Sequence, residues 1–275
     1  MKITELMTPD VVTAGLPGTR EDVIEILQEG EISSIPVTKD GQYRGLVSRE
    51  ELLRDGGEDQ LAMLMREVPT VSTDATVEDC ARLMLDEDER RVPVVEDGEV
   101  VGIVTLTDIV EHIAGLGDET DIGELIDGRV LTVWNDTPVR VTVETLTLAD
   151  ETAACVLDDA CEMVGIVTET DCVRVSDVDT SSEELGEAVA NQDDEWMWEG
   201  IKATSTQLVP VSKVTFPDAP VSDYMAEDIV TVVRSTDASD AAEAMTENEV
   251  QHLPVKRGDD LVGMLRDTDL LRAVL

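Results

Sequence analysis

The chain has 275 residues, enough for two domains of ordinary size that each bury a hydrophobic core. Its 62 acidic and 20 basic residues give a formal net charge of -42, and the basic residues form no stripe, which argues against binding to nucleic acid. Aromatic residues make up 2% of the chain and hydrophobic residues 42%, so its cores must be aliphatic, a composition that suits small repeated units.

The acidic charge and the N-terminus predict the protein's surroundings. Repulsion among so many acids destabilises a compact state in dilute buffer, whereas at about 1 M salt the screening length falls to roughly 3 Å. We therefore expect a halophilic protein from a high-salt cytoplasm, with an acidic mesophilic protein as the alternative. The N-terminal MKITELMTPD lacks the apolar stretch of a signal peptide, and no run approaches the ~20 apolar residues of a membrane span. A soluble, cytoplasmic protein is expected.

A motif recurs four times along the chain. Each copy opens with a tripeptide that ends in threonine, at Val11-Val12-Thr13, Val68-Pro69-Thr70, Val130-Leu131-Thr132 and Ile229-Val230-Thr231. Twenty-three residues after the threonine stand Pro36, Pro93 and Pro254, and in the third copy Val156 stands one residue later. Nine residues further on is a glycine and six beyond it an acid: Gly45 and Glu51, Gly102 and Asp108, Gly165 and Asp171, Gly263 and Asp269. This spacing indicates an internal repeat.

The secondary structure of one copy is clearest in the second. Thr76 can cap a helix whose Val77, Cys80, Ala81 and Met84 share one face, and copies one and four repeat this pattern with Val23, Ile26 and Leu27 and with Ala241, Ala244 and Met245. The stretch VPVVEDGEVVGIVT predicts two strands joined by a turn at Asp97-Gly98. A second helix is expected from Thr107 as its N-cap to about Gly115. Each copy is therefore predicted to run strand, helix, strand, strand, helix.

The predicted fold is α/β (α+β), with copies that pair because a sheet this small cannot cover both of its faces. The third copy is the weakest, since VRVTVETLTL has β-branched residues where a helix is expected. An insertion at residues 177–220 holds a predicted helix from Glu183 to Ala190 and a Trp-Met-Trp cluster at 196–198, which either packs on its own domain or docks a partner. The predicted domains are copies 1–58, 59–118, 119–176 (degenerate) and 221–275, with the insertion between the last two.

The four cysteines show no metal or disulfide pattern. Cys80, Cys155, Cys161 and Cys172 form no Cys-x-x-Cys pair and sit in apolar surroundings. Buried free thiols are the expected state.

The repeated motif resembles that of CBS-domain proteins. The resemblance rests on Met7 to Thr13 (MTPDVVT), on Val92-Pro93-Val94 and on Gly102 to Asp108 (GIVTLTD), and it covers nearly the whole chain outside the insertion. It implies that copies one and two, and copies three and four, pair into two Bateman modules whose clefts often hold adenosine derivatives. The arrangement is similar to the gamma subunit of AMP-activated protein kinase and to archaeal proteins built only from these repeats.

The resemblance implies candidate ligand residues, and copy two shows them most fully. An adenosine ligand needs an apolar slot for the purine, an acceptor for the ribose hydroxyls and cations for any phosphate. The slot is expected from Val68, Thr70, Val92 and Pro93, the ribose contact from Asp108 with Thr105, and the phosphate contact from Arg90 and Arg91. The alternatives are that Asp108 only caps its helix and that both arginines form surface ion pairs with the local acids of EDGE.

The other copies carry the same positions with departures. Copy four has Ile229, Thr231, His252, Leu253, Pro254 and Asp269, but Arg266 replaces the usual Thr or Ser and could serve phosphate or block the cleft. Copy three has Thr132, Thr168 and Asp171 but no cation before Val156, so a polyphosphate would face Asp158, Asp159 and Glu162, whereas S-adenosylmethionine, a cation, or no ligand would be tolerated. Copy one has Thr13 and Ser48, with Glu51 in place of aspartate.

The favoured function is a non-catalytic regulator. An adenosine-type effector (AMP, ADP, ATP or S-adenosylmethionine) would bind between paired copies and alter an unidentified protein partner, with no cofactor and no metal. A structural or interaction module with degenerate clefts is the alternative, and a homodimer stays open. Catalysis is disfavoured because only His112 and His252 are present, with no phosphate-binding glycine loop or catalytic triad spacing.

Overall fold

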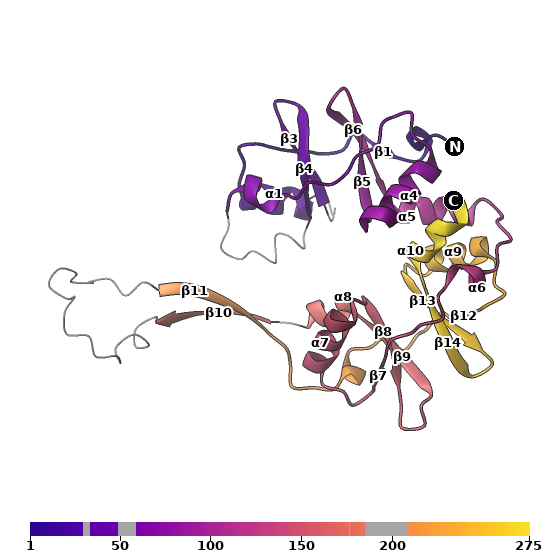
Figure 1. Cartoon of the computed structure of the whole chain (residues 1–275). Coiled ribbons are helices and arrows are strands. Elements are labelled where there is room, and N and C mark those ends of the chain that lie inside the picture. Colours follow the sequence, from indigo (N-terminus) through magenta and orange to yellow (C-terminus); the bar gives the residue numbers. More distant parts are fainter. Residues whose placement is uncertain (30–33, 49–58, 176, 185–207) are drawn as a thin grey trace, which may run out of the picture.

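The computed structural model describes residues 1–29, 34–48, 59–175, 177–184 and 208–275 (Figure 1). The predicted ligand residue Glu51 and the Trp-Met-Trp cluster lie outside the described residues. No helix among the described residues is long and apolar enough to cross a membrane.

Copies one and two form the first half of the chain. Their elements are η1 (Ile3–Glu5), β1 (Thr8–Pro9), β2 (Ala14–Gly15), α1 (Arg20–Glu29), β3 (Ser34–Lys39), β4 (Gln42–Ser48), α3 (Leu61–Leu64), α4 (Val77–Glu87), β5 (Arg91–Glu96), β6 (Glu99–Thr105) and α5 (Leu106–Ala114).

Copies three and four follow, separated by the insertion. Their elements are α6 (Ile122–Leu125), β7 (Thr132–Trp134), α7 (Val139–Ala149), β8 (Ala153–Leu157), β9 (Met163–Thr168), α8 (Glu169–Arg174), η2 (Val221–Asp223), β12 (Val232–Val233), α9 (Ala238–Glu247), β13 (His252–Arg257), β14 (Asp260–Arg266), α10 (Asp267–Leu270) and η3 (Leu271–Val274).

The insertion contains an antiparallel hairpin of β10 (Asp177–Glu184) and β11 (Leu208–Thr215). It extends away from the four copies in Figure 1. The predicted helix from Glu183 to Ala190 is wrong at its start, because Glu183 and Glu184 pair with Val209 and Leu208 in the ladder. The rest of that prediction lies outside the described residues.

The predicted α+β order recurs around four small sheets. In copies one, three and four a short first strand runs parallel to the next, which pairs antiparallel with the third, as in β7-β8-β9. In copy two the first strand is reduced to one parallel bridge between Val71 and Val94. Register shifts occur at equivalent places in all four sheets, at Val37/Thr38, Val94/Val95, Val156/Leu157 and Val255/Lys256. The exact limits of the four copies stay a prediction.

Local sequence signals set the element ends. Thr76 caps α4 as predicted, since its hydroxyl accepts a hydrogen bond from the Asp79 amide while the Asp79 carboxylate accepts from Thr76. Asp97 and Gly98 adopt the predicted positive φ angles, 51° and 87°. The N-cap of α5 is Thr105 rather than the predicted Thr107, because the Thr105 hydroxyl accepts from the Asp108 amide. Gly115 ends the helix as expected.

Helix α7 forms despite its β-branched sequence. Val139, Thr142 and Leu146 are buried along one face. The hydroxyls of Thr145 and Thr147 donate to the carbonyls four residues before them, at 2.7 and 3.0 Å. Packing of the buried face therefore outweighs the weak helix propensity.

The copies pair as predicted, by laying their leading segments on each other's sheets. Residues Thr8 and Pro9 of copy one pair with β6 of copy two, and Arg66 of copy two pairs with Leu46 on β4 of copy one. Ala226, ahead of copy four, pairs with Ile166 on β9 of copy three. Copies one and two form one module and copies three and four the other.

The recurring glycine gives room to the partner's leading segment. A Cβ atom on Gly45 would lie 2.6 Å from the Arg66 carbonyl oxygen, and one on Gly102 would lie 3.0 Å from the Thr8 carbonyl oxygen. At Gly165 the nearest obstacle is the Met225 sulfur. The spacing that identified the repeat thus marks positions where two chain segments approach closely.

Gly45→Ala should therefore destabilise the first module by about 1–3 kcal/mol, because the backbone of Arg66 must move and its bonds with Leu46 weaken. Gly15→Ala is the matched control, since a Cβ there meets nothing within 4 Å. Urea unfolding at fixed high salt measures both. Equal midpoints for the two variants would contradict the packing role of Gly45.

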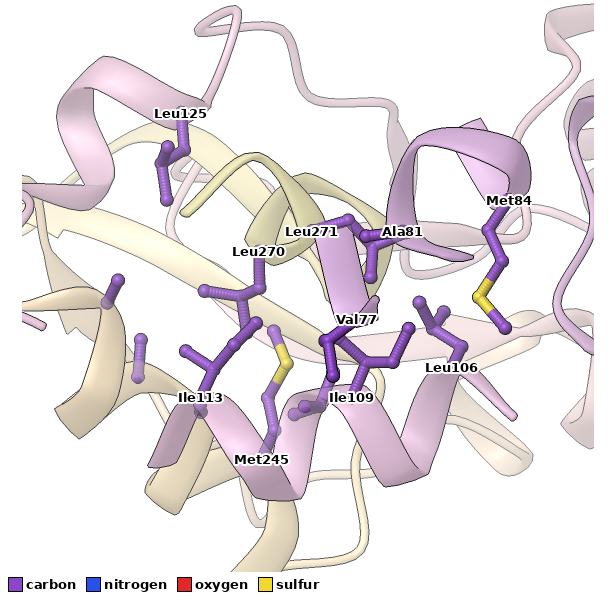
Figure 2. Close-up of a cluster of buried hydrophobic side chains, with 14 of the residues drawn as sticks. Val77, Ala81, Met84, Leu106, Ile109, Ile113, Leu125, Met245, Leu270 and Leu271 are labelled. Atoms are coloured by element: carbon purple, nitrogen blue, oxygen red, sulfur yellow. The ribbon is translucent and has the colours of Figure 1, made fainter. Parts of the chain in front are cut away.

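The largest hydrophobic core joins the two modules. Buried residues of α4 and α5 from copy two pack with residues of α9, α10 and η3 from copy four, as Figure 2 shows for Val77, Ile109, Met245 and Leu270. The buried Ser239 hydroxyl on α9 donates to the Ile113 carbonyl on α5. Copies two and four are therefore held together by apolar packing within one chain.

Three of the four cysteines are buried free thiols, as predicted, but Cys161 is exposed. Burial raises the pKa of Cys80 and of Cys155 to about 12 and that of Cys172 to about 11. At pH 8 we expect one fast-reacting thiol per folded chain in a disulfide-exchange assay, since thiolates react and buried thiols do not. Cys161→Ser should remove the fast phase and Cys80→Ser should keep it; two fast thiols would contradict the burial pattern.

Candidate functional site

A cavity of about 520 Å³ lies between copies three and four and is called here the Asp171 cleft. The end of β9 and the start of α8 supply Thr168 and Asp171. Copy four supplies Gln251, which directly precedes β13, and His252, which begins it, and Arg90 reaches the same cavity from copy two. Three copies thus contribute to one cleft.

Thr168 and Asp171 form a capping box at the start of α8. The Thr168 amide and hydroxyl donate to Asp171 Oδ2 at 3.0 and 2.7 Å, and the Asp171 amide donates back to the hydroxyl at 3.3 Å. The box fixes the carboxylate at the cavity wall and engages one of its two oxygens. An acid in a first helical turn is also favoured by the helix dipole.

His252 stands where the Asp171 cleft meets a second cavity. Its Nε2 atom lies 2.9 Å from the Thr152 hydroxyl, and both residues line both cavities. Burial lowers the pKa of His252; the charges of Asp267 and Glu151 oppose this shift, and those of Arg266 and Arg90 add to it. The imidazole is therefore uncharged at neutral pH and can act as a hydrogen-bond donor or acceptor.

The second cavity, of about 480 Å³, is called here the central cavity. Arg90 of copy two makes a two-point ion pair with Asp267 of copy four across it. Arg266 makes a second two-point pair with Glu151 of copy three. These pairs connect copies two, three and four around a polar centre.

Comparison with known proteins identifies the family. A family model described as the CBS domain matches residues 3–57, 61–115 and 221–275, which together exceed half of the chain. The chain belongs to the CBS-domain family. Its four copies are referred to below as CBS repeats, and the two pairs of repeats are Bateman modules.

Similar proteins occur among archaea. The chain is 25% identical over 279 residues to the uncharacterized protein MJ1404 of Methanocaldococcus jannaschii, covering 99% of this chain and 61% of that relative, so it spans less than two thirds of the relative's length. A crystal structure of an uncharacterized conserved protein from Pyrococcus horikoshii matches with a TM-score of 0.73 and 27% identity over 100% of both chains. The structure of MJ1225 from M. jannaschii, described as a candidate archaeal homologue of g-AMPK, matches with a TM-score of 0.69 and 16% identity over 99% of both, which shows the shared fold.

The structure groups the predicted ligand residues differently from the sequence. The ligand was expected between paired repeats, but its candidate residues were assigned repeat by repeat. In the structure Thr168 and Asp171 of the third repeat line one cleft together with His252 of the fourth. Thr132 instead lines another cavity, of about 550 Å³, beside Cys161 and the turn at Asp259 and Asp260. This grouping arises because the segment ahead of a repeat pairs with the sheet of its partner. Ala226, ahead of the fourth repeat, pairs with Ile166 of the third.

The predicted apolar slots belong to the hydrophobic cores. Val92 and Leu253 are fully buried in the core that joins the modules, and Val68 is buried with Leu46 and Ile103. Pro93 and Pro254 are buried beside them. The remaining slot residues are partly or fully exposed: Thr13, Thr70, Ile229 and Thr231.

Both carboxylate oxygens of Asp269, in the fourth repeat, already accept hydrogen bonds. Its Oδ2 accepts from the Arg266 amide at 3.0 Å and its Oδ1 from Arg272 Nη1 at 2.8 Å. The residue is buried, and burial raises its pKa. The predicted ribose contact at Asp269 therefore conflicts with the structure, which commits both carboxylate oxygens to neighbouring arginines.

Neither predicted role of the arginines, phosphate contact or pairing with the local acids, fully matches the structure. Arg90 does not pair with the local acids, because it pairs with Asp267, 177 residues away. Arg91 lies opposite Thr105 in the β5–β6 ladder, next to the capping box in which Asp108 holds Thr105 at 2.7 Å. Arg266 meets Glu151 at the edge of the central cavity rather than filling the Asp171 cleft. Ser48 is buried at the end of β4.

Of the three acids predicted to face a ligand in copy three, Asp158 and Asp159 line neither cavity, whereas Glu162 lines the cavity that contains Thr132. Asp158 accepts from the backbone amides of its own turn, and Asp159 accepts from the Trp134 indole. Sequence reasoning missed Glu151, Thr152 and Asp267, whose partners lie 100 or more residues away. In the described residues no group of three or more His, Cys, Asp or Glu side chains is placed to hold a metal ion.

Proposed function

We propose that this CBS-domain protein is a non-catalytic sensor that binds an adenosine-type small molecule in the Asp171 cleft. The observation that carries the proposal is the convergence of a fixed carboxylate, an imidazole and an amide side chain, those of Asp171, His252 and Gln251, on one cavity of about 520 Å³. That volume lies within the roughly 300–1,000 Å³ range of small-molecule sites. The MJ1225 likeness supports the fold of such a sensor.

Each polar group has a role in the proposal. Asp171 Oδ1 accepts the ribose hydroxyls while Oδ2 keeps the helix cap, and His252 and Gln251 bond the rest of the nucleoside. Ile166 and Val250 supply apolar contact. Because the cleft is shared between repeats, a ligand that prefers one arrangement of them shifts the population toward it, and a partner can read this change.

Replacing the ribose acceptor tests the proposal. Asp171→Asn should weaken binding of adenosine, AMP, ATP or S-adenosylmethionine about ten- to a hundred-fold, the loss of a charge-assisted hydrogen bond of about 1.5–3 kcal/mol. Calorimetric titration at about 1 M KCl measures it, with unfolding curves to confirm folding. Asp79→Asn is the matched control, since it removes the equivalent capping carboxylate of α4. Binding that tolerates Asp171→Asn as well as Asp79→Asn would refute the site.

An interaction module is the second candidate. The occupied Asp269 and the projecting β10–β11 hairpin favour it (Figure 1). Recovery of the same intact partner by the wild type and by Asp171→Asn, with none of the four adenosine compounds bound, would support this function over ligand sensing.

A further inference from the structure

Both arginines that line the two cavities are engaged by carboxylates. Arg90 Nη1 lies 3.1 Å from Asp267 Oδ1, and Nη2 contacts Oδ2. Arg266 Nε lies 3.1 Å from Glu151 Oε2, and its Nη2 lies 2.6 Å from the same oxygen. The Asp267 side chain is only 9% exposed, so its charge depends on Arg90 for compensation.

The walls of the two cavities are otherwise acidic. The described lining residues include two arginines, Arg90 and Arg266, and seven acids: Asp88, Asp150, Glu151, Glu169, Asp171, Glu249 and Asp267. The imidazole of His252 adds no positive charge at neutral pH, because burial lowers its pKa. Among the described residues, no lysine lines either cavity.

This charge distribution opposes a phosphate group. For a nucleotide held by its ribose at Asp171, Arg90 is the one arginine or lysine among the described residues that line this cleft. Asp267 already binds both terminal nitrogens of Arg90, so a phosphate that displaced it would leave a nearly buried carboxylate unpaired, and a phosphate that bound another N–H of Arg90 would lie beside that carboxylate as a second anion. An uncharged or cationic nucleoside requires no such displacement.

We infer that Asp267 is a specificity-determining residue, which holds Arg90 so that the Asp171 cleft selects unphosphorylated or cationic adenosine derivatives over nucleotides. The pair with Asp267 discriminates against nucleotides, because it occupies the arginine that a phosphate would bind. This inference rests on the proposed function, because it concerns the ligand class of the same cleft.

Adenosine and AMP differ only in the phosphate and provide the test. By calorimetry at about 1 M KCl, the wild type should bind adenosine at least about tenfold more tightly than AMP, as expected when a charge pair must be broken. Asp267→Asn should improve AMP binding about ten- to a hundred-fold and change adenosine binding little, since Arg90 becomes available. Asparagine keeps a side-chain oxygen for the Thr268 amide, now 2.8 Å from Asp267 Oδ1.

Two further variants define the cause. Asp260→Asn removes an acid from an exposed pair with Arg257 at 3.9 Å and should leave the ratio of the two affinities unchanged. Adding Arg90→Gln to Asp267→Asn should abolish the gain in AMP affinity.

The possible outcomes separate the two proposals. A wild type that prefers AMP, or an Asp267→Asn protein with an unchanged affinity ratio, would overturn the inference while leaving the cleft intact. If Asp267→Asn does not fold, the wild-type ratio still decides. Failure of adenosine, AMP, ATP and S-adenosylmethionine alike to bind the wild type, or binding indifferent to Asp171→Asn, overturns the proposed function and this inference with it.

Discussion

Raising KCl from about 0.1 M to about 3 M should raise the thermal unfolding midpoint by about 10 °C or more. The formal charge of -42 is confined to 275 residues, and its self-repulsion falls as the screening length shrinks from roughly 10 Å to about 3 Å or less. Each kcal/mol regained corresponds to about 2–4 °C in a protein of this size class. Thermal melts followed by circular dichroism measure the effect.

Screening must be separated from general stabilisation by solutes. Sucrose at matched osmolality strengthens burial without screening charge, so it serves as the control. Most of the KCl effect should appear below about 1 M, where screening changes most. A midpoint that stays flat or falls with KCl, or that sucrose raises equally, would argue against a protein adapted to high salt.

Local chemistry made much of the fold predictable. The Thr76 cap, the Asp97-Gly98 turn and the buried face of Val77, Cys80 and Met84 all depend on residues within a few positions of one another. The spacing of Gly45, Gly102 and Gly165 was informative because the same close approach to a partner segment recurs in every module. The family match at 3–57, 61–115 and 221–275 agrees with three of the four copies.

The candidate site was less predictable because its contacts are distant in the chain. Arg90 and Asp267 are separated by 177 residues, and Arg266 and Glu151 by 115. The sequence predicted a cleft between paired repeats but assigned its residues repeat by repeat, whereas the Asp171 cleft combines residues of the second, third and fourth repeats. Among so many acids, Asp267 and Glu151 carried no local signal, and only the three-dimensional arrangement shows that they neutralise the arginines.

The position of the Asp171 cleft connects ligand binding to the association of the two modules. Arg90 belongs to the second repeat and precedes β5, whose repeat packs on the fourth through α4 and α5. A change in the Arg90–Asp267 pair would therefore act on two repeats that already share a core. The strength of that core sets how far a ligand can move one module against the other.

Ile109→Ala should cost about 2–5 kcal/mol of unfolding free energy, since Ile109 is fully buried on α5 at the centre of the core that joins the second and fourth repeats. Figure 2 shows it among Val77 of α4, Leu106 of α5 and Met245 of α9, which cannot all close over the cavity left by the lost side chain. Ile109→Val should cost only about 0.5–1.5 kcal/mol. Urea unfolding at constant high KCl gives the three values.

The control for Ile109→Ala is Leu148→Ala on α7, a residue 79% exposed, which should change the unfolding free energy by no more than about 0.5 kcal/mol. Because the Ile109 core spans both modules, its loss should lower the midpoints reported by probes in either one, such as the Tyr43 and Tyr224 environments of the first and second module. If Ile109→Ala costs less than about 1 kcal/mol, or destabilises the first module alone, then the second and fourth repeats are not held together by this core, and ligand binding at Asp171 has no packed route to the first module.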